Sequence, residues 1–542
     1  MDSWYVMLDY TKVFVFASSL YIQPPPLTMI FSSKQIDAGS TGSRMHLYEW
    51  KPRTLHNDHE VQEVVSGRTL SNPGTDSRWT ARLRPGISTF ADLPDDQIVE
   101  ALAEYLEPLL DFSKHVLASK RDRFDTFPIY LRATAGMRTL TTADRARVMN
   151  GVRTLFSNTT YSPFYFQEEQ ARVISGEEEA IFGWAGVNFL LGTLIDDSQG
   201  AGVVVKPRLT YGALDLGGAS TQISFYQPDQ DIMSNLFKLQ IGQGKHWNLY
   251  SHSFLEYGIE AATNRFEARL IDGMDTTERL VDGVHNPCLP GGASKHIRNN
   301  IHVDADNVET WDYDKSSVSG SYQNAILKNA NTGGDYETCS TFVKALLHQD
   351  KNDWCEFSHR GDCSFAGVYQ PELPLQSKHF GEFLAFSNFY HVWDFLQLPS
   401  RSTLAALDNA TRTVCSMSET EVHDYAGDLF YAPAMINDMC FRSTYAFQLL
   451  RNGYGFKMDD SITATNVIGG QKVGWTLGAI MYEINTLPWH YVTRAEPEVV
   501  MDPFLGTSIF FAALVCGMLF ALGSIFRSRR ASQRYQYESI KQ

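Results

Sequence analysis

The main body of the sequence has no concentrated basic patch, and nowhere does the chain contain a CxxC pair. The formal net charge is −16, although the last sixteen residues are basic. A body this acidic binds polyanions poorly, so we expect no nucleic-acid partner. Any phosphate that the protein handles should be held by backbone amides and a metal ion. The lack of CxxC spacing also disfavours a structural zinc site.

What the sequence does contain is typical of a globular protein. It has 542 residues, of which 43% are hydrophobic and 20% charged. This composition excludes a largely disordered chain. At roughly 100 to 200 residues per domain, the length predicts two or three folding units.

The cysteines lie mainly in one region. Six of the seven fall between residues 288 and 440, and Cys516 lies in an apolar run. An even set of this kind is typical of disulfides and of an oxidising compartment, whereas six unrelated buried thiols are the alternative. Two sequons, at Asn158 and Asn409, favour the same compartment and predict a glycoprotein.

Two apolar segments suggest a membrane. Phe504–Phe526 is a run of 23 uncharged residues, about 34 Å long as a helix, which predicts a transmembrane helix. The arginines that follow it predict a cytosolic tail over 527–542, with the body extracellular or in the Golgi and secretory lumen. The apolar segment within residues 1–30 could be a signal-type segment, a membrane anchor or a gene-model artefact.

The body alternates between helical and extended patterns. Apolar spacing predicts helices over 98–116 and 142–156, and the segments 128–133 and 172–174 are typical of strands. Strands that alternate with helices indicate an α/β fold.

An internal repeat is the most informative feature. Asp37 begins Asp-Ala-Gly-Ser-Thr-Gly-Ser-Arg between two extended segments, and Asp215 begins Asp-Leu-Gly-Gly-Ala-Ser-Thr between two others. Glycines allow a tight turn whose N–H groups face an anion, and an aspartate at a strand end suits a hard divalent cation. A single copy is usually only a tight turn, but two matching copies predict two related lobes that clamp a nucleotide phosphate chain.

The repeat and three further blocks carry a resemblance to a known family. The blocks are Tyr130–Arg138 (Tyr-Leu-Arg-Ala-Thr-Ala-Gly-Met-Arg), Val173–Trp184 and Trp475–Gly478. With the repeat, they run in order from about residue 35 to 490. The sequence resembles the nucleoside triphosphate diphosphohydrolases, or apyrases, which belong to the actin, Hsp70 and hexokinase superfamily.

The resemblance implies an α/β fold of two ribonuclease-H-like lobes with an active-site cleft between them. It also implies a requirement for Mg²⁺ or Ca²⁺ and the hydrolysis of nucleoside di- and triphosphates, and it leaves the oligomeric state open. The expected division is lobe I over 31–174, lobe II over 175–465, and a return to lobe I over 466–500.

Three consecutive glutamates, residues 177 to 179, are candidates for the general base. Ser175 and Glu178 have the spacing of a capping box, which would commit Glu178 to helix N-terminal N–H groups. By resemblance the catalytic glutamate is the one before a glycine, which maps to Glu179, although this sequence has Ala180 in place of the glycine. The alternative is an acidic first turn favoured by the helix dipole.

The other site residues are also implied by the resemblance. Ser220 and Gln222 would hold the attacking water, and Asp37 and Asp215 would hold the hydrated metal. The residues expected to line the phosphates are Ser40, Thr41, Gly42, Ser43, Arg44, Thr134, Gly217, Gly218 and Ala219. Arg138 could be structural or phosphate-binding.

Base recognition and disulfide pairing rest on the same resemblance. Tyr390 would stack on the base, but it lies in an aromatic stripe that periodicity alone assigns to the core. The implied pairs are Cys288 with Cys339, Cys355 with Cys363, and Cys415 with Cys440.

Several alternatives for the function remain open. One is a secretory-pathway nucleoside diphosphatase restricted to UDP and GDP. Others are a related kinase or exopolyphosphatase, and a nucleotide receptor without catalytic activity.

Overall fold

The computed structural model contains two compact units, one of residues 25–53 and 63–488, the other of residues 1–24, 54–62 and 489–542. The structure describes the following residues: 31–50, 55–56, 73–76, 78–194, 209–227, 235–241, 245–272, 274–275, 277–297, 301–303, 320–322, 324–348, 363–486, 491–492, 518–519, 522–525, 527 and 529. In the second unit, β3 (Leu55–His56) pairs in parallel with β21 (Tyr491–Val492).

The first unit contains two large sheets. In its described part, the first sheet has the order β4-β2-β1-β5-β6, and the second sheet has the order β17-β18-β16-β7-β8-β10-β9. The strands of the first sheet are β1 (Phe31–Gly39), β2 (Gly42–Trp50), β4 (Thr80–Leu83), β5 (Ile129–Ala133) and β6 (Ala171–Val173). Those of the second are β7 (Thr210–Leu216), β8 (Ser220–Tyr226), β9 (Leu236–Ile241), β10 (Lys245–Leu255), β16 (Phe380–Ser387), β17 (Arg401–Thr403) and β18 (Ser461–Ala464).

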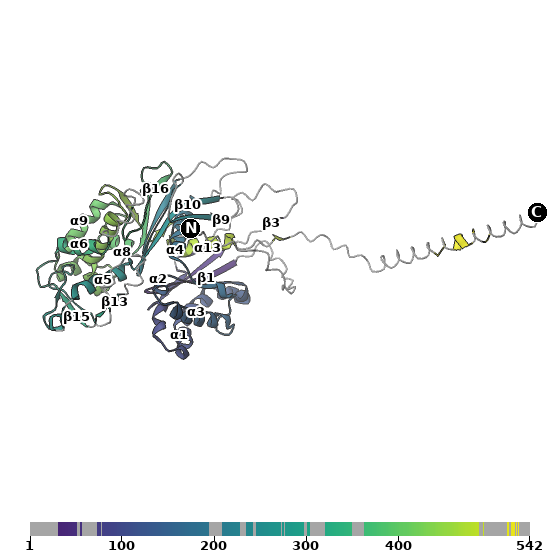
Figure 1. Ribbon diagram of the computed structural model, residues 1–542, viewed down its shortest axis with the longest axis horizontal. Helices are drawn as coiled ribbons and strands as arrows, with labels where there is room; N and C mark the ends of the chain where they lie inside the picture. Colours follow the sequence, from purple (N-terminus) through teal and green to yellow (C-terminus); the bar gives the residue numbers. More distant parts are fainter. Residues whose placement is uncertain are drawn as a thin grey trace, which may run out of the picture. The chain divides into compact units, whose positions relative to one another are not determined.

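Helices cover both sheets (Figure 1). The main ones are α1 (Asp95–Val116), α3 (Thr142–Ser157), α4 (Gly176–Leu190), α5 (Ile259–Ile271), α6 (Tyr336–Ala345), α8 (Asn388–Phe395), α9 (Leu404–Cys415), α10 (Glu419–Ala426), α12 (Met439–Gln448) and α13 (Trp475–Thr486). Shorter helices are α2 (Ala135–Arg138) and α11 (Pro433–Asn437). Small sheets combine β11 (Val284–His285), β12 (Ser294–Ile297) and β15 (Ala325–Lys328), β13 (Ile301–Val303) with β14 (Gly320–Tyr322), and β19 (Val467–Ile468) with β20 (Gln471–Lys472).

The elements expected from the sequence in the first sheet are confirmed. The helices α1 and α3 and the strands β5 and β6 lie within one or two residues of the expected ranges, apart from the start of α1. Leu102 of α1 and Val148 of α3 are fully buried in one hydrophobic cluster with Ile36 and Leu131 of the sheet. Their helical spacing turns one face of each helix toward the strands, which is why the pattern predicts the element.

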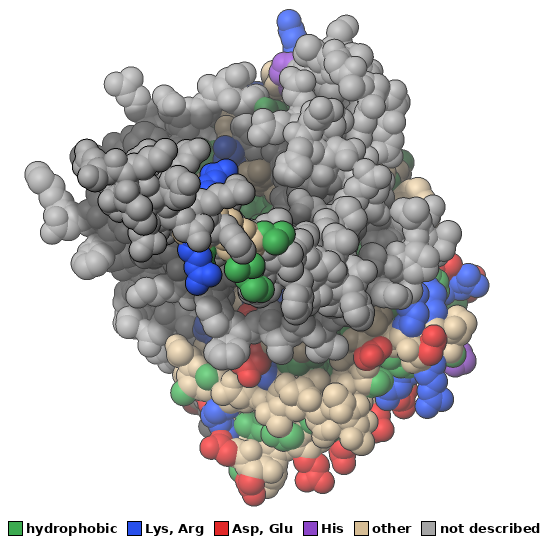
Figure 2. All heavy atoms as spheres, turned by 90° about the vertical axis from the view of Figure 1, so that its right-hand side faces the viewer, with side chains coloured by type: hydrophobic (Ala, Val, Ile, Leu, Met, Phe, Trp, Pro, Cys, Tyr) green, Lys and Arg blue, Asp and Glu red, His purple; other side chains and the backbone are tan. Residues whose placement is uncertain are grey.

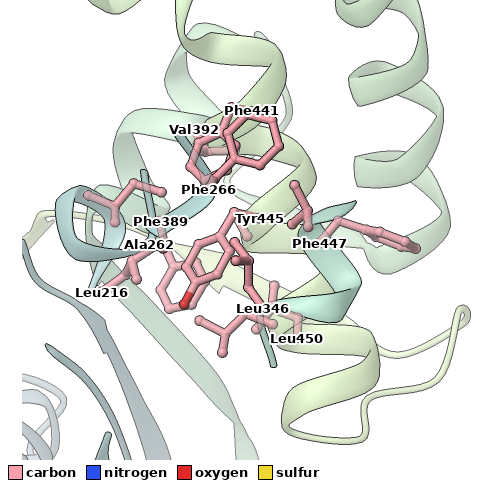
Figure 3. Packing of buried hydrophobic residues seen from close by; sticks show 14 of the residues in the cluster. Leu216, Ala262, Phe266, Leu346, Phe389, Val392, Phe441, Tyr445, Phe447 and Leu450 are labelled. Carbon is pink, nitrogen blue, oxygen red and sulfur yellow. The ribbon is translucent and has the colours of Figure 1, made fainter. Parts of the chain in front are cut away.

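A large hydrophobic core lies on one face of the second sheet. Figure 3 shows Phe266 of α5, Phe389 of α8 and Phe441 and Tyr445 of α12 gathered there, with Leu216 from the end of β7. The ring centroids of Phe266 and Phe441 are 4.9 Å apart. This packing places the end of β7 against α5.

The pair of helices α4 and α13 lies between the two sheets. Trp184 of α4 and Met481 of α13 belong to a cluster with residues of the second sheet, whereas Leu477 and Ile480 of α13 pack with Tyr48 and Tyr130 of the first sheet. The Tyr48 hydroxyl is 2.9 Å from Thr476 Oγ1. The helices approach closely at glycines: a Cβ on Gly478 would lie 1.9 Å from the carbonyl oxygen of Phe182.

The structure corrects the expected transmembrane helix over Phe504–Phe526. Among the described residues, no helix is both long enough and apolar enough to cross a membrane. The 22-residue α1 has the length but carries charged residues along it. Residues 504–517, the apolar segment within 1–30 and most of the expected tail lie outside the described residues.

The disulfides follow the expected pairing where the structure describes both partners. Cys288 is bonded to Cys339, and Cys415 to Cys440. Cys363 is also disulfide-bonded, but its expected partner, Cys355, lies outside the described residues. These bonds confirm the interpretation of the cysteines as disulfide-forming and reject six unrelated thiols.

Candidate functional site

Each glycine-rich turn joins the two strands of a β-hairpin, and the two turns lie against each other. The first joins β1 to β2, with Gly39 paired to Gly42, and the second joins β7 to β8, where the Gly217 N–H donates to the Ser220 carbonyl over 3.0 Å. A Cβ on Gly218 would lie 2.5 Å from Ser40 Oγ and 2.8 Å from Thr41 Cγ2. The second turn can approach the first this closely because position 218 has no side chain.

Helix α5 orients the peptide groups of the second turn. The N–H groups of Ile259 and Glu260, at the start of α5, donate to the carbonyls of Gly217 and Gly218, each over 2.9 Å. A trans peptide directs its N–H opposite to its C=O. The N–H groups of Gly218 and Ala219 therefore point away from α5, which leaves them directed toward an anion on the other side of the turn.

Thr134, at the end of β5, lies beside the first turn, whereas Gly42 and Ser43 of that turn face β4 and α1. The Thr134 N–H donates to the Ala38 carbonyl over 3.1 Å. Gly42 backs onto β4, where a Cβ would lie 2.2 Å from the Leu83 carbonyl oxygen. The Ser43 N–H donates to the Tyr105 hydroxyl over 3.1 Å. Gly42 thus contacts the strand β4, and Ser43 contacts the helix α1.

Of the three glutamates at the start of α4, Glu178 forms the capping box that its spacing from Ser175 predicts. The Ser175 hydroxyl accepts from the Glu178 N–H, and Glu178 accepts from the Ser175 N–H, which is a complete capping box. Glu178 also forms a two-point ion pair with Arg172, with distances of 2.7 and 2.8 Å. The Glu178 carboxylate therefore binds its local partners Ser175 and Arg172.

Glu179 of α4 lies in a hydrogen-bonded cluster with Arg138 of α2 and with residues of β8. Arg138 Nη2 donates to Glu179 Oε2 over 2.9 Å and to Ser220 Oγ over 3.1 Å. Gln222 Nε2 donates to Ser220 Oγ over 2.6 Å. The Glu179 side chain is 10% exposed and that of Arg138 12% exposed. The structure thus brings together the three residues that the resemblance assigns to catalysis.

Three carboxyl groups influence one another at this site. The pKa of Asp215 is raised to about 7, chiefly by burial and then by the charges of Glu179 and Asp37. Burial likewise raises the pKa of Asp37 to about 7, although Arg44 opposes this. Burial also raises the pKa of Glu179, against the opposing effect of Arg138. A cluster of poorly hydrated carboxyl groups attracts a cation.

Comparisons with known proteins identify the family of the chain. Residues 35–499 match the model of the GDA1/CD39 (nucleoside phosphatase) family. The chain belongs to this family. It is 30% identical over 503 residues to ectonucleoside triphosphate diphosphohydrolase 1 of Bos taurus, covering 90% of this chain and 86% of that protein. It is 28% identical to probable apyrase 6 of Arabidopsis thaliana, covering 89% and 79%.

A solved structure shares the fold of this GDA1/CD39 family member. A nucleoside triphosphate hydrolase structure from Neospora caninum superposes with a TM-score of 0.56 at 16% identity, covering 84% of this chain and 92% of that one. The resemblance found in the sequence is therefore confirmed, as are the α/β fold and the prediction of an enzyme that hydrolyses phosphate bonds of nucleotides.

The donor set of this family member suits a hydrated divalent cation. Asp215 Oδ1 is buried and has no hydrogen-bond partner among the residues that the structure describes. In the same part of the chain, no group of three or more His, Cys, Asp or Glu side chains could hold a metal ion. Two carboxylates would leave the remaining positions of a Mg²⁺ or Ca²⁺ ion to water and to phosphate oxygens.

Tyr390 lies on α8, away from the Glu179 cluster in sequence and in its contacts. The other members of its aromatic stripe, Phe389 and Trp393 among them, are buried in the core, whereas Tyr390 is half-buried and contacts the His391 ring, with centroids 5.6 Å apart. Arg82 and Arg44 help to lower the pKa of His391, after burial. This end of α8 is thus within electrostatic reach of the arginines near the first turn.

The sequence left two contributors to the site unassigned. From the sequence, Arg138 could have either a structural or a phosphate-binding role. In the structure, it donates hydrogen bonds to Glu179 and Ser220. Ser253, which accepts from Gln222 Nε2 over 3.0 Å, was not singled out. Its position in the block His252-Ser-Phe-Leu-Glu-Tyr-Gly is the signal that could have drawn attention to it.

Proposed function

We propose that this protein hydrolyses nucleoside tri- and diphosphates in a reaction that depends on a divalent metal ion. Water would attack the terminal phosphorus directly, with Glu179 as the general base. The observation that carries the proposal is that Arg138 Nη2 donates to both Glu179 and Ser220, immediately beside the paired glycine-rich turns. Phosphoryl transfer needs mainly positioning and charge neutralisation, and these groups supply both.

Asp37 and Asp215 would hold Mg²⁺ or Ca²⁺ through water molecules. The buried Asp215 Oδ1 and the raised pKa of both carboxyl groups support a cation there. When bound, such an ion neutralises negative charge on the phosphate oxygens and so favours attack by water.

The two turns would bind the phosphate chain from both sides. The N–H groups of Gly218 and Ala219 point away from α5, and Ser40 and Thr41 lie opposite them. The remaining polyphosphate contacts would come from Thr134 and Arg44. On the described part of the face seen in Figure 2, both acidic and basic side chains are present.

Glu179 would take a proton from the attacking water, which Ser220 and Gln222 orient. Burial raises the pKa of Glu179, which makes the carboxylate a stronger base, while Arg138 favours its ionised form. In the structure, Arg138 bridges Glu179 and Ser220 and so keeps both side chains at the same point. Tyr390, half-buried on α8, would stack on the base of the nucleotide.

Glu179→Gln tests this assignment, with Glu177→Gln as a matched control two residues away on the same helix turn. We expect Glu179→Gln to lower kcat for ATP by about 100- to 10,000-fold with nucleotide binding retained, and Glu177→Gln to leave kcat nearly unchanged. EDTA should abolish phosphate release, and added Mg²⁺ or Ca²⁺ should restore it. Near wild-type turnover by Glu179→Gln, or full activity in EDTA, would contradict the proposal.

A substrate panel separates the remaining alternatives. Release of phosphate from UDP and GDP but not ATP would indicate a restricted nucleoside diphosphatase, and release from inorganic polyphosphate would indicate an exopolyphosphatase. Nucleotide binding without turnover would indicate a receptor. The two described disulfides support a protein that matures in an oxidising compartment.

The two sheets support a division into two lobes around the site. Residues 31–174 would form lobe I, residues 175–465 lobe II, and residues 466–500 would return to lobe I. The packing of α13 on Tyr48 and Tyr130 supports the return.

A further inference from the structure

Ser253 lies directly behind the water-orienting pair proposed above. It belongs to β10, which is antiparallel to β8, and it is paired with Gln222 across the sheet. Its side chain is 3% exposed. Ser253 Oγ accepts a hydrogen bond from Gln222 Nε2 over 3.0 Å.

The hydrogen bonds of Gln222 leave its amide oxygen available. The Nε2 atom donates to Ser220 Oγ over 2.6 Å and to Ser253 Oγ over 3.0 Å, so both of its N–H donors are used. Gln222 Oε1 is buried and has no hydrogen-bond partner among the described residues. A buried acceptor of this kind is satisfied when it receives a proton from a water molecule.

The hydroxyl of Ser220 can supply the donor that faces the same water molecule as the Gln222 Oε1 acceptor. Ser220 Oγ accepts from Arg138 Nη2 over 3.1 Å and from Gln222 Nε2 over 2.6 Å, which uses both of its lone pairs. Its own O–H remains a donor. A water molecule at this point would donate to Gln222 Oε1 and to the Glu179 carboxylate while accepting from Ser220, which fixes its orientation.

Ser253 also contacts the helix that carries the base. A Cβ on Gly176, the first residue of α4, would lie 2.3 Å from Ser253 Cβ and 2.5 Å from its Oγ. The backbone at the start of α4 therefore packs directly on Ser253. This contact sets the distance between the strand that carries Gln222 and the helix turn that carries Glu179.

We propose that Ser253 is a positioning residue for hydrolysis. By accepting the second N–H of the Gln222 amide, it fixes the orientation in which Oε1, and not Nε2, is presented to the attacking water. Ser253 acts through Gln222 and does not touch the reacting atoms. This inference rests on the proposed function, because it assigns a role within the same site.

The substitution Ser253→Ala tests the role. It removes one oxygen atom and leaves the packing on Gly176 in place. We expect kcat for the preferred nucleotide to fall about fivefold, the loss that corresponds to one hydrogen bond of about 1 kcal/mol, with KM and Tm nearly unchanged. An unfixed amide misorients the water but does not weaken the binding of the phosphates.

Ser251→Ala is the matched control. Ser251 lies two residues earlier on the same face of β10 and is fully buried, and its hydroxyl has no hydrogen-bond partner in the described part of the chain. Its substitution removes the same atom from the same strand without touching Gln222. We expect the kcat, KM and Tm of Ser251→Ala to match those of the wild-type protein.

A double-mutant cycle with Gln222→Ala separates positioning from a general structural role. In the Gln222→Ala background, Ser253→Ala should cause no further loss of kcat, because its partner is already absent. Wild-type kcat in Ser253→Ala, or an equal loss in both backgrounds, would overturn the positioning role while leaving the proposed function intact. A wild-type protein that releases no phosphate from any nucleotide would instead refute the proposed function and the role with it.

Discussion

The glycine crossing between α4 and α13 leads to a sharp prediction about stability. A Cβ on Gly478 would lie 1.9 Å from the Phe182 carbonyl oxygen and 2.9 Å from the Gly186 nitrogen. Both atoms belong to the backbone of α4 and cannot rotate away. Gly478→Ala therefore requires the two helices to separate.

The cost can be estimated from these distances. A van der Waals separation of about 3.5 Å requires a shift of about 1.6 Å, and overpacking of this kind costs about 1–3 kcal/mol. The shift would also strain the hydrogen bond between Tyr48 and Thr476, at the start of α13, which adds about 1 kcal/mol. We expect a total of about 2–4 kcal/mol and, for a unit of this size, a fall in Tm of roughly 2–4 °C.

Thermal unfolding of Gly478→Ala beside Gly474→Ala checks this reasoning. A Cβ on Gly474, four residues earlier, would meet no atom of the described residues within 4 Å, so this control should melt like the wild-type protein. Phosphate release by Gly478→Ala should also fall, since α4 carries Glu179. If the two variants had the same Tm, the close helix crossing would be refuted.

Three further predictions follow from the buried lysine, the turn contact and a disulfide. Burial lowers the pKa of Lys34 well below 10.5, so the unfolded chain binds a proton that the folded protein releases, and stability should rise with pH toward 10.5. Because the Lys34 amine has no hydrogen-bond partner among the described residues, Lys34→Met should raise the free energy of unfolding by about 1–3 kcal/mol and flatten this pH dependence in urea titrations. Gly218→Ala would place a methyl group against Ser40 Oγ and should lower kcat/KM by on the order of 100-fold without changing Tm, whereas unchanged kinetics would argue against contact between the turns. Serine at both Cys415 and Cys440 opens a loop spanning 25 residues and should cost about 3 kcal/mol, with a reductant lowering the Tm of this variant less than that of the wild-type protein.

Local patterns in the sequence were enough to predict many of the elements. The helical spacing that predicts α3 is the same spacing that buries Val148 and Val152. The capping box at Ser175 depends only on residues three apart, so its prediction is confirmed in detail. The repeated Asp-Gly turns were recognisable because each is a complete local unit of strand, turn and strand.

Contacts between distant residues could not be predicted in this way. The hydrogen bond from Arg138 to Ser220 joins residues 82 positions apart. The hydrogen bond between Gln222 and Ser253 depends on the register of two strands. The mutual approach of Gly218 and Ser40 depends on how two hairpins meet. Apolarity alone also led to the transmembrane prediction for Phe504–Phe526, which the structure corrects.

The position of α13 has a consequence for the biosynthesis of the chain. The strands and helices of the first sheet, residues 31–173, are translated first and contain no cysteine, so they can begin to fold before any oxidant acts. Yet Tyr48 and Tyr130 on that sheet are covered by Leu477 and Ile480, which are translated about 350 residues after Tyr130. The part of the protein that is made first is therefore completed last, and its apolar face must be shielded until α13 arrives.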